Sequence, residues 1–176
     1  MLIVMKFGGT SVGSVSALQN LVDIVRRSYA QGHQLVVVVS AMSGVTDMLL
    51  NAARRAEAGD EATSHEARAK IGQKHAEALC HGIRVLGELT PRALDVIGGL
   101  GERLSAPQVA AILNKAGLPA QAVVATELIV TDNRFGGAVP IVEATAAKTK
   151  AGLLPIINEG KIPIVTGFIG ATEDGI

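Results

Sequence analysis

The sequence predicts an α/β protein in which a mostly parallel sheet lies between two layers of helices, a three-layer α/β/α sandwich. Two apolar, β-branched runs, Leu2–Phe7 and Leu35–Val39, are typical of strands buried on both faces, because neither alternates polar with apolar residues. Between them, apolar residues recur at helical spacing from Val15 to Tyr29. A strand, a helix and a second strand in this order form a βαβ unit with parallel strands.

The rest of the chain continues to mix helices and strands. Thr46 or Asp47 is a good N-cap for a second helix, and Thr90 followed by Pro91 predicts the start of another. Helices are expected over residues 46–59, 60–86, 91–98, 102–115 and 143–150, with a short one after Pro155. Further strands are expected over residues 120–126, 128–131 and 162–166, and residues 132–137 form a turn-rich loop.

The amino-acid composition argues against a disordered chain and against a nucleic-acid-binding protein. The chain has 176 residues, of which 48% are hydrophobic, and its 16 Lys and Arg balance its 16 Asp and Glu. A disordered chain would carry fewer apolar residues and more net charge, so one hydrophobic core is expected. Zero net charge and only four aromatic residues, one Tyr and three Phe, argue against a nucleic-acid partner.

Targeting and metal signals are missing from the sequence. No apolar run approaches the ~20 residues of a membrane span, and the start MLIVMKF is too short for a signal peptide. The single Cys80 excludes an internal disulfide, which suits a reducing compartment. The four histidines have no metal-ligand spacing, so no metal site made of protein side chains is expected. These features predict a cytoplasmic protein without a membrane partner.

The sharpest chemical signal is the loop after the first strand. Lys6 and Phe7 lead into Gly8 and Gly9, and a helix is expected to follow. Adjacent glycines carry no Cβ, so their backbone N–H groups can approach an anion closely, and the cation of Lys6 adds a full charge. These ingredients suit a polyphosphate. The loop is not a Walker A motif, because Ser14 stands where its lysine should be.

Five segments together resemble the aspartate kinases of the amino-acid kinase superfamily. They appear in the family's order and are distributed along nearly the whole chain, which makes their combination specific. The segments are Lys6–Val12 (KFGGTSV), Val39–Asp47 (VSAMSGVTD), Gly101–Ala106 (GERLSA), Asn133–Gly136 (NRFG) and Gly167–Gly170 (GFIG). The resemblance implies the carbamate kinase-like fold of that superfamily, of which this chain would form the N-terminal lobe.

The resemblance also implies an activity and a set of site residues. The reaction is the ATP-dependent phosphorylation of the L-aspartate β-carboxylate to 4-phospho-L-aspartate, the first step toward lysine, threonine and methionine. The implied phosphate-binding residues are Lys6, Phe7, Gly8 and Gly9, with Lys6 as the catalytic group. The implied residues around the aspartate are Ser40, Thr46, Glu102 and Phe168. Magnesium is expected to arrive with ATP and to be held mainly by phosphate oxygens.

These roles make chemical sense. The attacking carboxylate is already ionised at neutral pH, so catalysis needs positioning and charge neutralisation more than a strong base. Lys6 suits the neutralising task. Glu102 would pair with the ammonium of the substrate and so select an amino acid over a plain dicarboxylate. The hydroxyls of Ser40 and Thr46 can hydrogen-bond a substrate carboxylate without adding charge.

One departure from the family limits the expected activity. Family members continue into a Gly-Arg-Gly-Gly-Ser-Asp-like stretch that supplies an Arg and an Asp to the site, and this chain has no such stretch. Residues 1–176 are therefore expected to form the N-terminal, substrate-binding portion of the kinase domain. The nucleotide lobe and any regulatory domains are expected to lie outside it, and the chain is predicted to be inactive alone. The resemblance implies a homo-oligomer for the full-length protein.

Two other functions remain open from the residues alone. The chain could be a non-catalytic domain that binds an amino acid or a partner protein without turnover. It could also be a serine hydrolase, because Gly9–Gly13 spells the GxSxG motif with Ser11 as nucleophile, between an expected strand and helix. Against the hydrolase, only a few residues precede the motif, and Lys6 would have no task.

Overall fold

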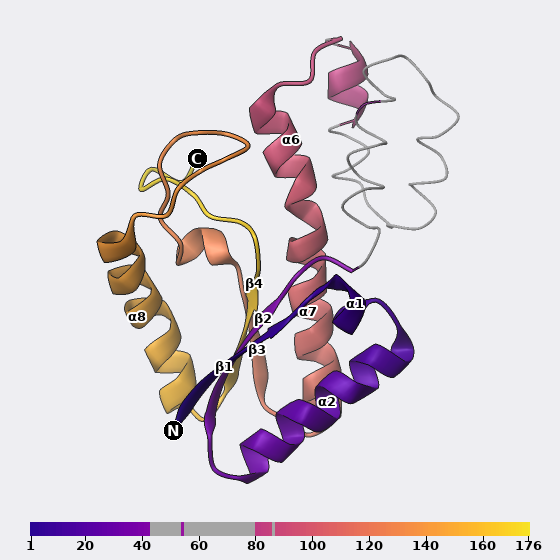
Figure 1. Ribbon diagram of the computed structural model, residues 1–176, viewed down its shortest axis with the longest axis vertical. Coiled ribbons are helices and arrows are strands. Elements are labelled where there is room, and N and C mark those ends of the chain that lie inside the picture. Colours follow the sequence, from indigo (N-terminus) through magenta and orange to yellow (C-terminus); the bar gives the residue numbers. More distant parts are fainter. Residues whose placement is uncertain (43–53, 55–79, 86) are drawn as a thin grey trace.

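The computed structural model describes residues 1–42, 54, 80–85 and 87–176. Its four strands form one parallel sheet in the order β1-β2-β4-β3, which confirms the predicted sheet (Figure 1). The strands are β1 (Leu2–Phe7), β2 (Gln34–Val39), β3 (Ala120–Val123) and β4 (Ile162–Thr166). Because all four strands run the same way, their carboxyl ends meet along one edge of the sheet, the upper one in Figure 1.

The helices labelled in Figure 1 are α1 (Gly9–Val12), α2 (Val15–Ala30), α6 (Pro91–Gly98), α7 (Leu100–Lys115) and α8 (Val142–Asn158). Ala125–Glu127 form a 3-10 turn, η1. Two of these helices, α2 and α6, begin after a side chain that caps them. The Ser14 hydroxyl accepts a hydrogen bond from the Ala17 N–H at 3.2 Å, and the Thr90 hydroxyl accepts one from the Ala93 N–H at 3.2 Å. Both are N-cap contacts that satisfy otherwise unpaired helix donors.

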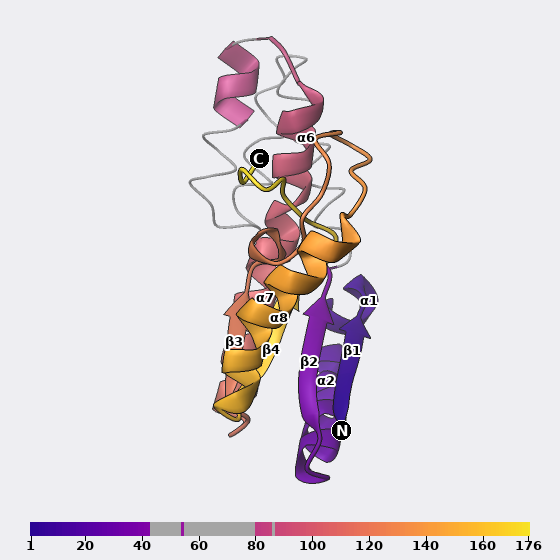
Figure 2. The same ribbon diagram turned by 90° about the vertical axis from the view of Figure 1, so that its left-hand side faces the viewer.

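The helices cover the sheet in two layers (Figures 1 and 2). On one face, Val37 of β2 and Ile164 of β4 belong to a buried cluster with residues of α2 and α7. On the other face, Val36 and Val165 belong to a second cluster with Leu153 of α8. Alternate residues of β2 and β4 thus enter opposite layers, as expected for strands inside an α/β/α sandwich.

The prediction of burial on both faces holds for β2 but is wrong for β1. Strand β1 is an outermost strand of the sheet, and α8 packs mainly against β4. As a result Leu2 is 50% and Val4 64% exposed, while Phe7 on the other face is buried. The apolar sequence of β1 therefore resembles that of an interior strand, although the described helices cover only one face of β1.

Two further sequence predictions need correction. Residues 128–131 form no strand; instead Val130 pairs with Ala171 and Thr131 with Pro140 as isolated bridges. Helix α8 is continuous through Pro155, where the sequence predicted two helices, because Leu153 and Ile157 on either side of the proline are both buried against the sheet. Of the helix predicted over 46–59, the structure describes residue 54 alone, which is helical. Of the helix predicted over 60–86, it describes residues 80–85, which are helical as predicted; the rest of both helices lies outside the described residues.

Candidate functional site

Three of the predicted site segments meet at the carboxyl edge of the sheet. Phe7 ends β1, Ser40 follows β2, and Gly167 follows β4. The Ser40 N–H donates to the Phe7 carbonyl oxygen at 3.1 Å, and the Gly167 N–H donates to the Val39 carbonyl oxygen at 2.7 Å. Ligands of open α/β sheets bind outside the carboxyl ends of the strands, so this edge is the candidate site.

Glu102 brings a buried negative charge to this edge. It lies in the first turn of α7 and is 4% exposed. Its Oε1 accepts a hydrogen bond from the Ala41 N–H at 3.1 Å, just beyond Ser40, whereas its Oε2 has no partner among the described residues. A buried carboxylate oxygen without a donor is costly. A ligand that carries an ammonium group would supply the missing donor.

Phe168 adopts a strained conformation beside the same strand ends. Its φ is +63°, the one positive φ among the described residues that are not glycine. The Ile169 N–H donates to the Gly167 carbonyl oxygen at 2.8 Å, which closes a tight turn of three residues around Phe168. The side chain is nevertheless 90% exposed. Strain of this kind persists where the surroundings enforce it, and it clusters at ligand-binding sites.

Gly8, directly after β1, leaves the backbone open to an anion. A Cβ placed on Gly8 would meet nothing within 4 Å, so a ligand can approach this part of the chain. The predicted helix from Val15 is confirmed as α2, but a short helix that the sequence did not predict, α1 with four residues, precedes it and is separated from it by Gly13 and Ser14. Four residues give only a small helix dipole, so the positive potential of this loop depends mainly on Lys6 and on single backbone N–H groups.

Lys6 and Glu102 approach the strand ends from opposite faces of the sheet. Phe7 packs in the cluster shared with α2 and α7, so the alternation along β1 directs the exposed Lys6 side chain to the other face. Glu102 belongs to α7, on the face that Phe7 shares. No ion pair joins the two residues in the described part of the chain. The described contacts therefore do not bring the cation and the anion to one face of the sheet.

Ser40 lies next to the end of β4, where Gly167 allows a close approach. A Cβ on Gly167 would lie 3.1 Å from the Val39 carbonyl oxygen and 3.7 Å from Ser40 Oγ. The missing side chain thus lets the two strand ends approach each other. Thr46, the remaining predicted aspartate contact, lies outside the described residues.

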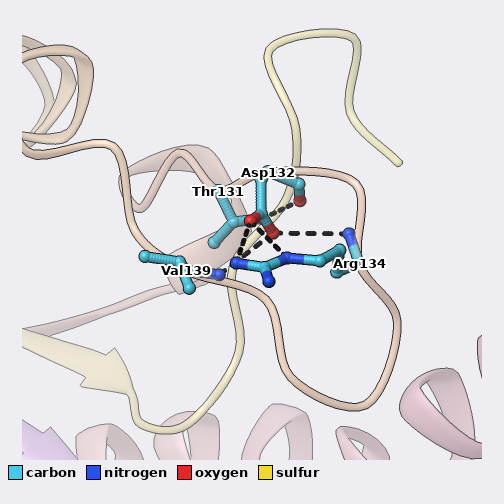
Figure 3. Close-up of polar contacts among 4 residues, drawn as sticks. All are labelled: Thr131, Asp132, Arg134 and Val139. Atoms are coloured by element: carbon cyan, nitrogen blue, oxygen red, sulfur yellow. Dashed lines mark hydrogen bonds and ion pairs between the residues drawn. The ribbon is translucent and has the colours of Figure 1, made fainter.

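Sequence reasoning assigned no role to the loop over residues 131–139, in which the structure shows three hydrogen bonds to one side chain. Asp132 Oδ1 accepts hydrogen bonds from the Val139 N–H at 3.0 Å and the Arg134 N–H at 3.3 Å. Its Oδ2 accepts one from Arg134 Nε at 2.8 Å (Figure 3). The Val139 N–H is the main reason that the pKa of Asp132 lies below its usual value, and the Arg134 guanidinium adds to the effect.

Among the described residues, no group of three or more His, Cys, Asp and Glu could hold a metal ion. No helix in that part of the chain is long and apolar enough to span a membrane. The hydrolase alternative finds no support: Ser11 follows the carboxyl end of β1, whereas His33 precedes β2 at the opposite end of the sheet. His81 contacts the Arg84 guanidinium at 3.3 Å, and His65 and His75 lie outside the described residues.

Comparison with known proteins identifies the family. The model of the "Amino acid kinase family" matches residues 1–176. The chain belongs to the amino acid kinase family. This assignment agrees with the observed parallel sheet and replaces the hydrolase alternative at Ser11.

Several aspartate kinases are similar to this chain. An aspartate kinase from Pseudomonas fluorescens is 34% identical over 183 residues, which cover 99% of this chain but 35% of that protein. The structure of E. coli aspartokinase III in complex with aspartate and ADP matches with a TM-score of 0.81 and 28% identity, over 99% of this chain and 42% of that one. The same enzyme with lysine and aspartate matches with a TM-score of 0.78 and 29% identity, over the same shares. The chain thus spans about a third of the length of the P. fluorescens relative.

Proposed function

We propose that this chain carries the aspartate-binding part of an aspartate kinase. The complete enzyme would phosphorylate the β-carboxylate of L-aspartate with ATP to give 4-phospho-L-aspartate, at the start of lysine, threonine and methionine biosynthesis. Support comes from the family match and from the similarity to an aspartokinase whose structure contains aspartate and ADP. A homo-oligomer in the cytoplasm is part of the same proposal.

The observation that carries the proposal is the half-satisfied carboxylate of Glu102. One oxygen is fixed by the Ala41 N–H at 3.1 Å, and the other is buried without a partner in the described part of the chain. The ammonium group of an amino acid supplies the charge and the donor that this oxygen lacks. In this arrangement Glu102 distinguishes aspartate from a dicarboxylate of the same length. Ser40, Thr46 and Phe168 are proposed to surround the rest of the substrate.

The phosphate-binding role is assigned to Lys6 and to the backbone of Phe7, Gly8 and Gly9. The exposed cation of Lys6 and the open backbone at Gly8 fit the phosphates of ATP. Lys6 would neutralise charge on the transferred phosphoryl group, and its loss would cost about 10²–10³ in rate, as for a donor to a developing oxyanion. Magnesium bound by the phosphates would reduce their charge further. Lys6 offers a cation and Gly8 an open backbone. Such groups bind phosphate oxygens and not a metal ion, so the phosphates are expected to hold the magnesium.

The proposal is tested by measuring ligand binding to this chain with Glu102→Gln. Glutamine keeps an oxygen for the Ala41 N–H but removes the negative charge, so the fold is preserved while the ammonium loses its partner. We expect isothermal titration calorimetry to show L-aspartate binding about 10- to 100-fold more weakly to the variant, the value of a charge-assisted hydrogen bond. Succinate, which lacks the ammonium, should bind the two proteins alike.

A matched control removes another glutamate. Glu127→Gln changes a carboxylate in the 3-10 turn η1 and should leave both affinities unchanged. Equal loss of aspartate and succinate binding in Glu102→Gln would contradict the proposed recognition of the ammonium. Tight binding of an unrelated ligand with no response to aspartate would favour the non-catalytic binding domain instead.

A further inference from the structure

Two separate contacts join the helix pair α6–α7 to the segment that carries Phe168. The first is a close approach at Gly99, the residue between the two helices. A Cβ on Gly99 would lie 2.9 Å from Cγ2 of Ile169, the residue that follows Phe168. Carbon atoms do not pack at that distance, so the missing side chain of Gly99 provides the space that Ile169 fills. Glu102 lies one turn further along the same helix, α7.

The second contact starts at Asp95 of α6. Its Oδ2 accepts a hydrogen bond from the Gly136 N–H at 2.7 Å, across 41 residues of sequence. Gly136 lies in the loop of residues 131–139, which we call the Asp132 loop. Asp132 holds both arms of this loop, since one of its oxygens accepts from the Arg134 N–H and the Val139 N–H (Figure 3). The loop therefore behaves as one unit that is tied to α6.

Residues at the base of the Asp132 loop form backbone hydrogen bonds with the segment that follows β4. The Thr131 N–H donates to the Ala171 carbonyl oxygen at 2.8 Å, and the Ala171 N–H donates to the Ile129 carbonyl oxygen at 3.0 Å. Between Phe168 and Ala171, a Cβ on Gly170 would lie 2.7 Å from Thr131 Cγ2. These contacts leave the segment little freedom to shift relative to the loop.

The conformation of Phe168 must be held by contacts of neighbouring residues. It is 90% exposed and has a φ of +63°, so neither burial nor backbone preference keeps it in place. We propose that Asp95 is a positioning residue, which acts through the Asp132 loop to fix Phe168 relative to Glu102. The part of this inference that concerns the amino-acid ligand rests on the proposed function.

Fluorine NMR tests the positioning role directly. The chain has three phenylalanines, so uniform labelling with 4-fluorophenylalanine gives three resonances, and Phe168→Leu identifies the one of interest. We expect Asp95→Ala to shift or broaden the Phe168 resonance, whereas the resonance of the buried Phe7 stays unchanged. L-Aspartate should bind Asp95→Ala about three- to tenfold more weakly, a smaller loss than in Glu102→Gln, because the lost hydrogen bond positions the loop and does not contact the ligand.

Rescue by a conservative variant separates positioning from general destabilisation. Asp95→Asn keeps an oxygen that can accept from the Gly136 N–H, so it should restore both the Phe168 resonance and the affinity. Asp132→Ala loosens the same loop without touching α6 and should also move the Phe168 resonance, which keeps the test available if Asp95→Ala does not fold. Asp23→Ala removes an exposed carboxylate that pairs with Arg26 in α2 and serves as the matched control.

The outcomes distinguish this inference from the proposed function. An unchanged Phe168 resonance in folded Asp95→Ala overturns the positioning role, even if the melting temperature falls. If the unaltered chain does not bind aspartate, the proposed function fails, while the fluorine spectra still decide whether Asp95 positions Phe168. If Glu102→Gln weakens aspartate binding and Asp95→Ala affects neither binding nor the spectrum, the proposed function stands and the inference is wrong.

Discussion

At the scale of single residues, Asp132 shows how one carboxylate can organise a loop. Its oxygens accept hydrogen bonds from two backbone N–H groups and from the Arg134 guanidinium, although the loop is exposed. Each of these contacts favours the ionised carboxylate, which lowers the pKa of Asp132 in the folded chain. The stabilisation is therefore present above the pKa of the unfolded chain and is lost as the pH falls through the lower pKa of the folded chain.

Replacing Arg134 should raise this pKa without restoring it fully. In Arg134→Gln the guanidinium is lost, but the Val139 N–H, the larger cause of the shift, still donates to Asp132. We expect the carboxyl ¹³C resonance of Asp132 to titrate below the ordinary aspartate value in the unaltered chain, and at an intermediate pH in the variant. Identical titration curves in the two proteins would show that Arg134 does not act on Asp132 in solution.

Site residues differed in how far the sequence could predict them. Glu102 could be found from its motif, but its contacts could not, because the Ala41 N–H that donates to its Oε1 lies 61 residues away. The lack of a partner for Oε2 among the described residues is likewise a tertiary feature. Asp95 carries no local signal, because its partner Gly136 is 41 residues distant. The positive φ of Phe168 is equally hidden, since glycine is the residue that sequence reasoning expects in such a turn.

At the scale of elements, one buried hydroxyl joins the sheet to the turn after β3. Thr166 ends β4 and is 2% exposed, and its Oγ1 accepts a hydrogen bond from the Ala125 N–H at 2.7 Å. The contact fixes the start of η1, where the chain leaves the sheet. It also explains why the sequence overestimated β3, which was predicted to extend through residue 126: the backbone of Ala125 bonds to a side chain of β4 instead of a strand.

Removing this hydroxyl should destabilise the fold. Thr166→Val keeps the shape of the side chain but leaves the buried Ala125 N–H without an acceptor, at a cost of about 1–3 kcal/mol in the free energy of unfolding. Urea unfolding measures the difference, and Thr166→Ser, which retains the hydroxyl, should lose clearly less. A Thr166→Val variant as stable as the parent chain would contradict the importance of this contact.

Regular elements were predicted well where periodicity alone decides them. Helix α2 follows the spacing of its apolar residues and ends before Gly32, whose φ is +76°. Helix α8 was predicted as two pieces, because Pro155 resembles a helix start when its burial context is unknown. Residues 128–131 have a strand-like composition. Their backbone forms two isolated bridges instead of a strand, one between Val130 and Ala171 and one between Thr131 and Pro140.

At the scale of the whole molecule, the parallel sheet defines where a ligand can bind. The glycines after β1, Ser40 after β2 and Phe168 after β4 lie at one edge because the strands are parallel, and α7 brings Glu102 to the same edge. The unbroken apolar runs of the first two strands and the helical spacing between them predicted the parallel sheet behind this arrangement. The exposure of Leu2 and Val4 was not predictable, because it depends on the position of β1 at the border of the sheet.

The central claim, an aspartate site at the carboxyl ends of the strands, is tested most directly by following backbone amide resonances of the ¹⁵N-labelled chain during titration with L-aspartate. We predict that the largest shifts occur at Ala41, which donates to Glu102, and at Phe168, while His33 and Gly160 at the opposite edge of the sheet stay unchanged. Shifts confined to His33, Gly160 and their neighbours, or no response at Ala41 at saturating aspartate, would contradict the account.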